Sequence, residues 1–477
     1  MIYAQEILTS KEMQEDIEFL TQTIKDVNPH ITIREKVTGT HIYEEIDSLR
    51  KNAKLEDFEN FYYLAKKILL LSQDQHNDFQ ESYFAEPEDS NLDISEESIA
   101  ISQRCSFEYD NFHPSGSISS LEYLEGNYYF TRDWYDRNGR HLIPVGARLL
   151  RVNNLPIDEY VSTVSRIVDN SIRWDSDLKK YYSLRVYVPQ LIGYSDSCLL
   201  VFSKDAIKDS LHYRGATIKS GVSSDYLKPK VLYFNQDHIL YVRVPSMETD
   251  HIDFYTENIL KYKDKQIDKV IIDVRSNQGG NDLVWMNIVS AITGNINFVK
   301  EEDLYIRNTS TAINYLQIVR KMGVNKEDVF SIRDDSFIRV ATQPDTIKNW
   351  PPSINYSGKI YVMVDNRCFS STLAFIATCN RNNDFITIGQ SSGYIGGRGI
   401  TPFFFVLPHS KLLFTINPIL DTTGIENVEN YYDNYVKIPV TCSIQDITFE
   451  TDYKGERYGE EFLYKYDPVF QKVLKLE

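Results

Sequence analysis

Two adjacent serines, Ser370 and Ser371, stand where an apolar strand pattern gives way to a helix pattern in "IYVMVDNRCFSSTLAFIATC". A serine at the start of a helix is most often a cap, but at such a turn it can also act as a nucleophile. A nucleophilic hydroxyl needs a base that accepts its proton. The 40 residues after Ser370 contain no lysine and one histidine, His409, which falls at the expected tip of a hairpin. A base would therefore have to come from another part of the chain.

A second turn with chemical potential is the segment "DVRSNQGGN", residues 273–281. Its glycines, Gly279 and Gly280, follow a strand pattern and precede a helix pattern, so their N–H groups could bind a developing oxyanion. Taken alone, a glycine pair is more often a tight turn that needs glycine's conformational freedom. The segment lacks the spacing of a phosphate-binding loop or a dinucleotide fingerprint. Together, the two turns would supply the nucleophile and the donors that acyl transfer requires.

The elements that would position these turns alternate between strand and helix from about residue 230 onward. The apolar runs "KVIIDV" and "KIYVMV" are typical of strands buried on both faces, and a helix pattern follows each of them. The segment "FFFVLPHSKLLFTI" predicts a hairpin with residues 408–411 at its tip. This order of elements predicts an α/β core with covering helices.

The first half of the chain predicts helices and then strands. Thr9 and Glu12 have capping-box spacing before a helix that should end at Pro29. A further helix is predicted in "LEDFENFYYLAKKILLL", which runs into "SQDQHNDF". Residues 79–100 are acidic and serine-rich, which predicts a linker. After it, "IPVGARLLRVNNLPIDEYVSTVSRIV" predicts a strand, a turn, a short strand and a helix.

Composition excludes several classes of protein. The chain has 477 residues, enough for roughly three domains, and a net charge of −17 that would repel nucleic acid and anionic lipid. No apolar run approaches the length of a membrane span. The five cysteines form no CxxC pair, so neither a disulfide framework nor a zinc cluster is predicted. No metal and no cofactor are expected.

The N-terminal residues bear on localisation. "YAQE", near the start, is similar to the end of a secretory signal whose charged and apolar regions are missing. This indicates an exported protein, placed in the periplasm, in the cell envelope or outside the cell, whose signal peptide is absent from this chain. A cytoplasmic N-terminus is the alternative.

Five motifs, in order, resemble the C-terminal processing, or tail-specific, serine peptidases, in particular their tricorn-like branch. "VIIDVRSNQGG" is similar to the family's strand end Asp-Leu-Arg-x-Asn-x-Gly-Gly, and "VMVDNRCFSSTLAF" is similar to its nucleophile segment. "TIGQSSGYIGG" is similar to its Gly-Glu-x-Thr-x-Gly element. "IPVGARLLRVNNLPIDEY" resembles its PDZ-like segment, and "NPH … SQDQHNDF" resembles the helical cap of the tricorn-like branch.

The resemblance implies a catalytic set. The family nucleophile precedes a glutamate by three residues, and Leu373 occupies that glutamate position here, which implies Ser370 as the nucleophile and leaves Ser371 as the alternate. The tricorn-like branch takes its base from the helical cap, which implies His76 in "DQHND". An imidazole suits this task because it titrates near neutral pH.

The branch also has a glutamate near the C-terminus that supports the base. This implies Glu429 in "IENVENYYDNYVKIPV", with Glu426 as the alternate. The oxyanion hole would consist of backbone N–H groups of Gly279 or Gly280 and of Ser371.

The organisation implied by the resemblance has three parts. Residues 1–95 would form an N-terminal helical cap, residues 96–222 a PDZ-like β-rich domain, and residues 223–477 an α/β serine peptidase core of the ClpP/crotonase-like type. The implied function is a serine endopeptidase that cleaves extended or unfolded peptides through an acyl-enzyme. A peptide or unfolded protein would be the partner, held by its C-terminus.

Departures from the family pattern, such as Gln390 in place of a glutamate, leave two alternatives open. One is a catalytically degenerate relative that binds a peptide or a small ligand. The other is a crotonase-like acyl-CoA enzyme, against which the PDZ-like segment and the cap argue.

Overall fold

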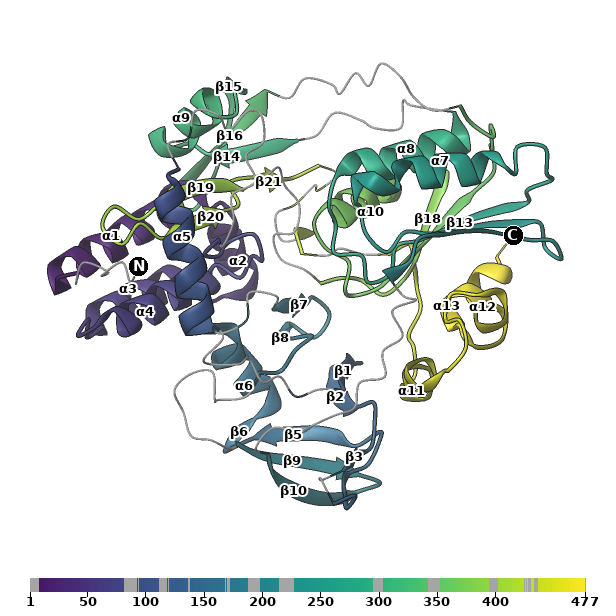
Figure 1. The fold of residues 1–477 in the computed structure, drawn as a ribbon, viewed down its shortest axis with the longest axis horizontal. Helices are drawn as coiled ribbons and strands as arrows, with labels where there is room; N and C mark the ends of the chain where they lie inside the picture. The colour runs from purple at the N-terminus through teal and green to yellow at the C-terminus, as the bar shows by residue number, and fades with distance from the viewer. Residues whose placement is uncertain are drawn as a thin grey trace.

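Figure 1 shows the computed structural model of the chain, with N-terminal helices in purple, a β-rich unit in blue and an α/β unit in teal and green. The structure describes residues 8–80, 92, 94–110, 118, 120–135, 138–167, 169, 172–187, 198–213, 227–294, 303–341, 352–393, 402–423, 425, 427, 430–432 and 436–476.

The N-terminal helices are α1 (Ser10–Val27), α2 (His30–Thr38), α3 (Ile42–Asn52), α4 (Phe58–Leu71) and α5 (Glu96–Cys105). The predicted capping box is present, since the Thr9 hydroxyl accepts from the Glu12 N–H and the Glu12 carboxylate accepts from the Thr9 N–H. The predicted linker is wrong for residues 96–100. Helix α5 begins there because the Ser95 side chain caps it by accepting from Ser98 N–H.

The helices bury their apolar faces in a cluster shared with strands from the second half of the chain. These strands are β14 (Leu304–Arg307) and β16 (Asp335–Ala341), which form a sheet with β15 (Gly323–Ile332) and β21 (Leu420–Asp421), and the predicted hairpin β19 (Phe403–Val406) and β20 (Leu413–Ile416). The hairpin tip is docked on α1, where the buried Asp16 carboxylate accepts from the N–H groups of His409 and Ser410. His409 itself pairs with Glu15 at 2.8 Å, so its ring is turned to α1.

The β-rich unit holds an antiparallel sheet in the order β1 (Leu121–Leu124), β2 (Asn127–Phe130), β5 (Arg148–Val152), β9 (Cys198–Lys204) and β10 (Ile207–Tyr213). The short strand β6 (Leu155–Pro156) pairs with β5 and leads into α6 (Ile157–Thr163), as the sequence predicted. Two hairpins accompany the sheet: β3 (Trp134–Tyr135) with β4 (His141–Ile143), and β7 (Arg173–Asp175) with β8 (Lys180–Tyr182).

The α/β unit is built on a six-stranded sheet. Its order is β11 (Lys230–Phe234), β12 (Ile239–Arg243), β13 (Lys269–Asp273), β17 (Ile360–Val364), β18 (Phe385–Gly389) and β22 (Ile438–Pro439), and all pairs but the first are parallel. Because β13 and β17 are parallel neighbours, the turns that follow them meet at the same edge of the sheet.

Helices cover both faces of this sheet (Figure 1). Alternate strand residues such as Val270 and Val362 pack on α7 (Ile252–Leu260), α8 (Asp282–Thr293) and α10 (Ser371–Arg381). The intervening residues, such as Ile271 and Tyr361, pack on the C-terminal helices α12 (Glu460–Tyr466) and α13 (Pro468–Leu474). No helix in the described ranges is both long and apolar enough to cross a membrane.

Candidate active site

Ser370 lies in a strained backbone conformation between β17 and α10. Its φ of 52° and ψ of −126° fall in a region that non-glycine residues rarely adopt. Such outliers cluster at functional sites, where the surrounding structure enforces them. Here the chain is fixed on both sides, because Phe369 N–H donates to the Asn277 carbonyl at 3.1 Å and the Ser370 carbonyl accepts from Leu373 N–H at 2.8 Å.

The two serines of this turn have different surroundings. The Ser371 hydroxyl donates to the carboxylate of Asp282, in the first turn of α8, which also accepts from the indole N–H of Trp285. Ser371 is buried, whereas Ser370 is partly exposed and its hydroxyl faces a histidine. The side chain of Ser371 is therefore structural in this geometry.

His76 lies opposite Ser370, although 294 residues separate them in the sequence. Its Nε2 atom is 3.2 Å from Ser370 Oγ. The imidazole stacks on the ring of Phe369, with 4.7 Å between ring centroids, and is 18% exposed. The turn after α4 thus brings together the two residues that the sequence singled out as nucleophile and base.

Asp74 fixes the other side of the imidazole. Its Oδ1 atom is 2.9 Å from His76 Nδ1 and also accepts from His76 N–H at 2.9 Å. Its Oδ2 atom accepts from Asn417 Nδ2 at 2.8 Å. Burial alone would raise the pKa of the fully buried Asp74 carboxyl, but His76 and His30 outweigh this effect and the pKa is lowered. The carboxylate is therefore ionised beside the imidazole.

Sequence reasoning missed Asp74. The available signal was an aspartate two residues before a histidine at a helix end, where an aspartate side chain commonly accepts from the N–H two residues on. The glutamates favoured from the sequence, Glu429 and Glu426, lie outside the described residues. Within those residues, Asp74 is the carboxylate that contacts His76.

The glycine turn contacts the nucleophile turn directly. Gly279 has a φ of 97°, and a β-carbon placed on it would lie 2.6 Å from the Ser370 β-carbon and 3.0 Å from Ser371 N. Its N–H donates to Asn277 Oδ1 at 2.8 Å. Among the hydrogen bonds between described residues, none uses the N–H of Gly280 or of Ser371. Of the three donors considered from the sequence, these two are available to an oxyanion.

A set of polar contacts holds the two turns against each other. The carboxylate of Asp365 accepts from Ser276 N–H at 2.8 Å and from its hydroxyl at 2.9 Å. Cys368, two residues before Ser370, is fully buried and directs its thiol toward the Val274 carbonyl at 3.3 Å. Burial raises the pKa of this thiol well above its usual value, which makes it a poor nucleophile.

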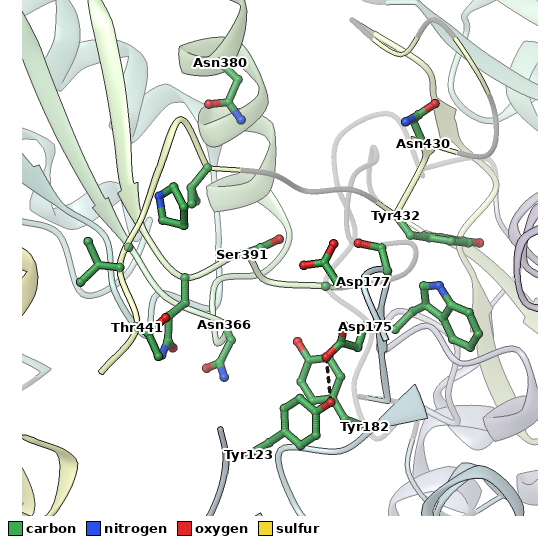
Figure 2. A pocket seen from close by; sticks show the side chains of 18 of the residues that line it. Tyr123, Asp175, Asp177, Tyr182, Asn366, Asn380, Ser391, Asn430, Tyr432 and Thr441 are labelled. Atoms are coloured by element: carbon green, nitrogen blue, oxygen red, sulfur yellow. Dashed lines mark hydrogen bonds between the residues drawn. The ribbon is translucent and has the colours of Figure 1, made fainter. Parts of the chain in front are cut away.

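A cleft of about 840 Å³ separates the β-rich unit from the carboxyl edge of the sheet (Figure 2). Tyr123, Asp175 and Tyr182 line one side, and the Tyr123 hydroxyl donates to Asp175 at 2.8 Å. Asn366 of the nucleophile turn and Gln390 after β18 belong to its lining. The two sides also touch, since Trp174 N–H donates to the Gly393 carbonyl at 2.9 Å and the Tyr182 hydroxyl to the Ser392 carbonyl at 3.0 Å.

One group of side chains in the described ranges has the chemistry of metal ligands: Glu248, Asp250 and His251, before α7. Both carboxylates are exposed, which is common without a metal, and this group is not part of the contacts around Ser370.

Comparison with known proteins finds similarity to one family of peptidases. A model of peptidase family S41 matches residues 238–432, which include Ser370 and both turns. The structure of mature CPAF complexed with lactacystin has the same fold, with a TM-score of 0.56, 12% identity and coverage of 98% of both chains. The structure of mature CPAF has a TM-score of 0.55 to this chain, with 12% identity and coverage of 97% of this chain and 98% of the CPAF chain. No curated protein sequence matches this chain at significant similarity. The matched segment, which carries Ser370, is similar to peptidase family S41, and the chain is a serine-type peptidase.

Proposed function

We propose that this chain cleaves peptide bonds with Ser370 as the nucleophile and His76 as the general base. The observation that carries the proposal is the 3.2 Å distance between His76 Nε2 and Ser370 Oγ. This distance is within reach of a hydrogen bond, which is the geometry that a base needs to accept the hydroxyl proton.

Asp74 fixes the tautomer and the orientation of the His76 imidazole for this step. When Nδ1 carries a proton and donates it to Asp74 Oδ1, Nε2 is left as the acceptor that faces Ser370. His76 then takes the hydroxyl proton while Oγ attacks the peptide carbonyl, and the imidazolium beside Asp74 is stabilised by the carboxylate charge. The free N–H groups of Gly280 and Ser371 would bind the oxyanion.

The acyl-enzyme forms when His76 returns its proton to the leaving amine and the C–N bond breaks. Water, deprotonated by the same imidazole, attacks the ester and releases Ser370. These residues, the substrate and water account for every proton transferred and every bond made or broken in these steps. The proposed reaction therefore uses no metal and no cofactor.

An extended peptide is the proposed substrate. The cleft is lined mainly by polar side chains and includes Asn366 of the nucleophile turn, although neither Ser370 nor His76 belongs to its lining. Side chains of the β-rich unit stand on one side and the carboxyl edge of the sheet on the other (Figure 2). We assign residues 1–95 as a helical cap of the tricorn-like type, because the base comes from there. We assign residues 96–222, whose first helix α5 packs with the N-terminal helices, as a PDZ-like domain that holds the peptide C-terminus, and residues 223–477 as the catalytic core. Export from the cytoplasm is part of the same proposal.

Covalent labelling with a fluorophosphonate tests the proposal. The probe phosphonylates activated serines, and digestion followed by mass spectrometry identifies the modified residue. We expect the label on Ser370 in the wild type and none in Ser370→Ala. A folded wild-type protein that takes no label, but binds peptides, would instead be a degenerate relative that binds without cleaving.

A further inference from the structure

His30 is a buried histidine beside the site that the proposed mechanism does not use. It is the first residue of α2, its side chain is fully buried, and its Nε2 atom lies 3.8 Å from Asp74 Oδ2. Within the described residues, neither ring nitrogen makes a hydrogen bond of good geometry, although the backbone of Ile419 lies near enough to interact with the ring as a weak partner. Burial lowers the pKa of His30 to about 4, against the opposing effect of Asp74, so the ring is neutral at neutral pH.

Packing alone does not explain an imidazole at this place. Burying polar atoms that are not fully hydrogen-bonded destabilises a fold, and a phenyl ring of similar size would fill the space without that loss and would give up only the weak contact with the Ile419 backbone. The His30 ring already packs against the ring of Tyr431, with 6.0 Å between centroids. The feature that a phenyl ring could not reproduce is a polar ring edge directed at Asp74.

Helix α2 supports the catalytic turn at a second point. One helical turn beyond His30, the fully buried guanidinium of Arg34 donates to the carbonyls of Ser72 and Gln73. These two residues lead the chain into Asp74, and Gln73 has a positive φ of 52° that this contact helps to hold. The turn that carries Asp74 and His76 therefore rests on one face of α2.

The charged and titratable groups around His30 come from three elements. Asp74 and His76 face it from the turn after α4, Arg34 from its own helix, and Tyr432 places its hydroxyl 3.5 Å from the His30 carbonyl. The fixed positive charge of Arg34 disfavours a second cation so close by. His30 therefore presents a dipole to Asp74 and leaves the carboxylate charge to His76.

We propose that His30 is a positioning residue for Asp74, an inference that rests on the proposed function. With its proton on Nε2, the neutral ring directs an N–H dipole at Oδ2 of Asp74. Together with Asn417, it holds that oxygen so that Oδ1 stays aimed at Nδ1 of His76. Because the ring carries no charge, it does not compete with the imidazolium that forms when His76 takes the proton of Ser370.

The test compares His30→Phe with His30→Gln in the full chain. Two quantities are measured: the rate of fluorophosphonate labelling against pH, and the low-field proton resonance of the His76 Nδ1–H that donates to Asp74. We expect His30→Phe to label roughly tenfold more slowly, at the low end of the 10–100-fold loss typical when a residue that orients a metal-ligating side chain is replaced. In His30→Phe, the midpoint of the pH–rate curve should move to lower pH and the His76 Nδ1–H resonance should move upfield. In His30→Gln, which keeps an N–H donor, both shifts should be smaller.

Tyr431→Leu is the matched control, because it removes the ring that packs on His30 and leaves the imidazole in place. We expect it to lower Tm and keep the wild-type pH profile and resonance. The inference is overturned when His30→Phe and His30→Gln both keep the wild-type rate, midpoint and resonance, or when Tyr431→Leu reproduces the effect of His30→Phe. A wild type without label would contradict the proposed function, and the resonance would still decide the role of His30.

Discussion

Gly279 and Ser370 are packed so closely that a β-carbon on Gly279 would lie 2.6 Å from the β-carbon of Ser370. The same β-carbon would be 2.9 Å from the Phe369 carbonyl oxygen, and the φ of 97° at Gly279 disfavours any side chain. Gly279→Ala should therefore push the nucleophile turn away from His76 and lower the labelling rate at least tenfold. A displacement of about 1 Å can cost a factor of 100 in rate.

Gly323→Ala is the control for this substitution. Gly323 lies in β15, its β-carbon would meet Ala341 at an ordinary 3.4 Å, and its φ is not positive. Gly323→Ala should label at the wild-type rate. Equal rates for Gly279→Ala and wild type would show that the contact between the turns does not set the position of Ser370.

The two serines should respond differently to substitution. Ser371→Ala removes a hydrogen bond to the Asp282 carboxylate, so it should lower the free energy of unfolding by about 1.5–3 kcal/mol and leave labelling at Ser370 intact. Ser370→Ala should abolish labelling at little cost in stability. Urea unfolding and intact mass measure the two effects, and a Ser371→Ala protein that is folded but unlabelled would assign the nucleophile to Ser371.

Asp74 and Glu429 compete for the supporting role, and substitution separates them. In Asp74→Asn the amide can donate to Nδ1 and leave His76 in the wrong tautomer, so kcat/KM should fall on the order of 10³–10⁴-fold. Glu429→Gln and Glu426→Gln should have smaller effects. If kcat/KM collapses in Glu429→Gln and survives in Asp74→Asn, the glutamate inferred from the family resemblance is the supporting carboxylate.

Acid should destabilise the protein through Asp273, at the end of β13. Burial opposes ionisation of this carboxyl, but Arg275 at 2.7 Å and Arg243 lower its pKa to about 2. An unfolded aspartate titrates near 3.9, so this contribution is present above that pH and is lost as pH falls toward 2, by roughly 2–3 kcal/mol.

Asp273→Asn tests this account by urea unfolding at several pH values. It should cost about 3–5 kcal/mol at pH 7, because it leaves the buried Arg243 without its carboxylate, whereas the partly exposed Arg275 keeps Asp467 at 2.7 Å. Its stability should vary less between pH 4 and 2. If Asp273→Asn loses as much stability between pH 4 and 2 as the wild type does, other carboxyls cause the acid sensitivity.

Sequence patterns predicted the α/β unit well because its signals are local. The apolar runs of β13 and β17, and the glycines and serines after them, specify strands that end in turns at one edge of a sheet. The capping box at Thr9 and the hairpin around residues 408–411 were local signals too. Ser370 and His76 were reached through family motifs.

The parts that were missed depend on tertiary contacts. Asp74 has a role only because the turn after α4 faces Ser370, 296 residues away, and its sequence neighbourhood offers only the weak signal of a histidine two residues later. Two other contacts also join residues far apart in sequence: the buried Asp16 accepts hydrogen bonds from the hairpin tip, and Asp282 accepts one from the Ser371 hydroxyl. Residues 96–100, the first half of α5, were assigned to a linker because they continue an acidic, serine-rich segment, although the helix packs on the helical cluster.

The proposed mechanism depends on the pair formed by Ser370 and His76. Its most direct test is the rate of fluorophosphonate labelling against pH, measured in the wild type and in His76→Ala. The wild-type rate should rise with pH as the imidazole loses its proton and becomes able to accept the one on Ser370. In His76→Ala, the label should appear at least 100-fold more slowly and without that rise, since a positioned base contributes about 10²–10⁴-fold. Labelling of Ser370 in His76→Ala at the wild-type rate would contradict the account.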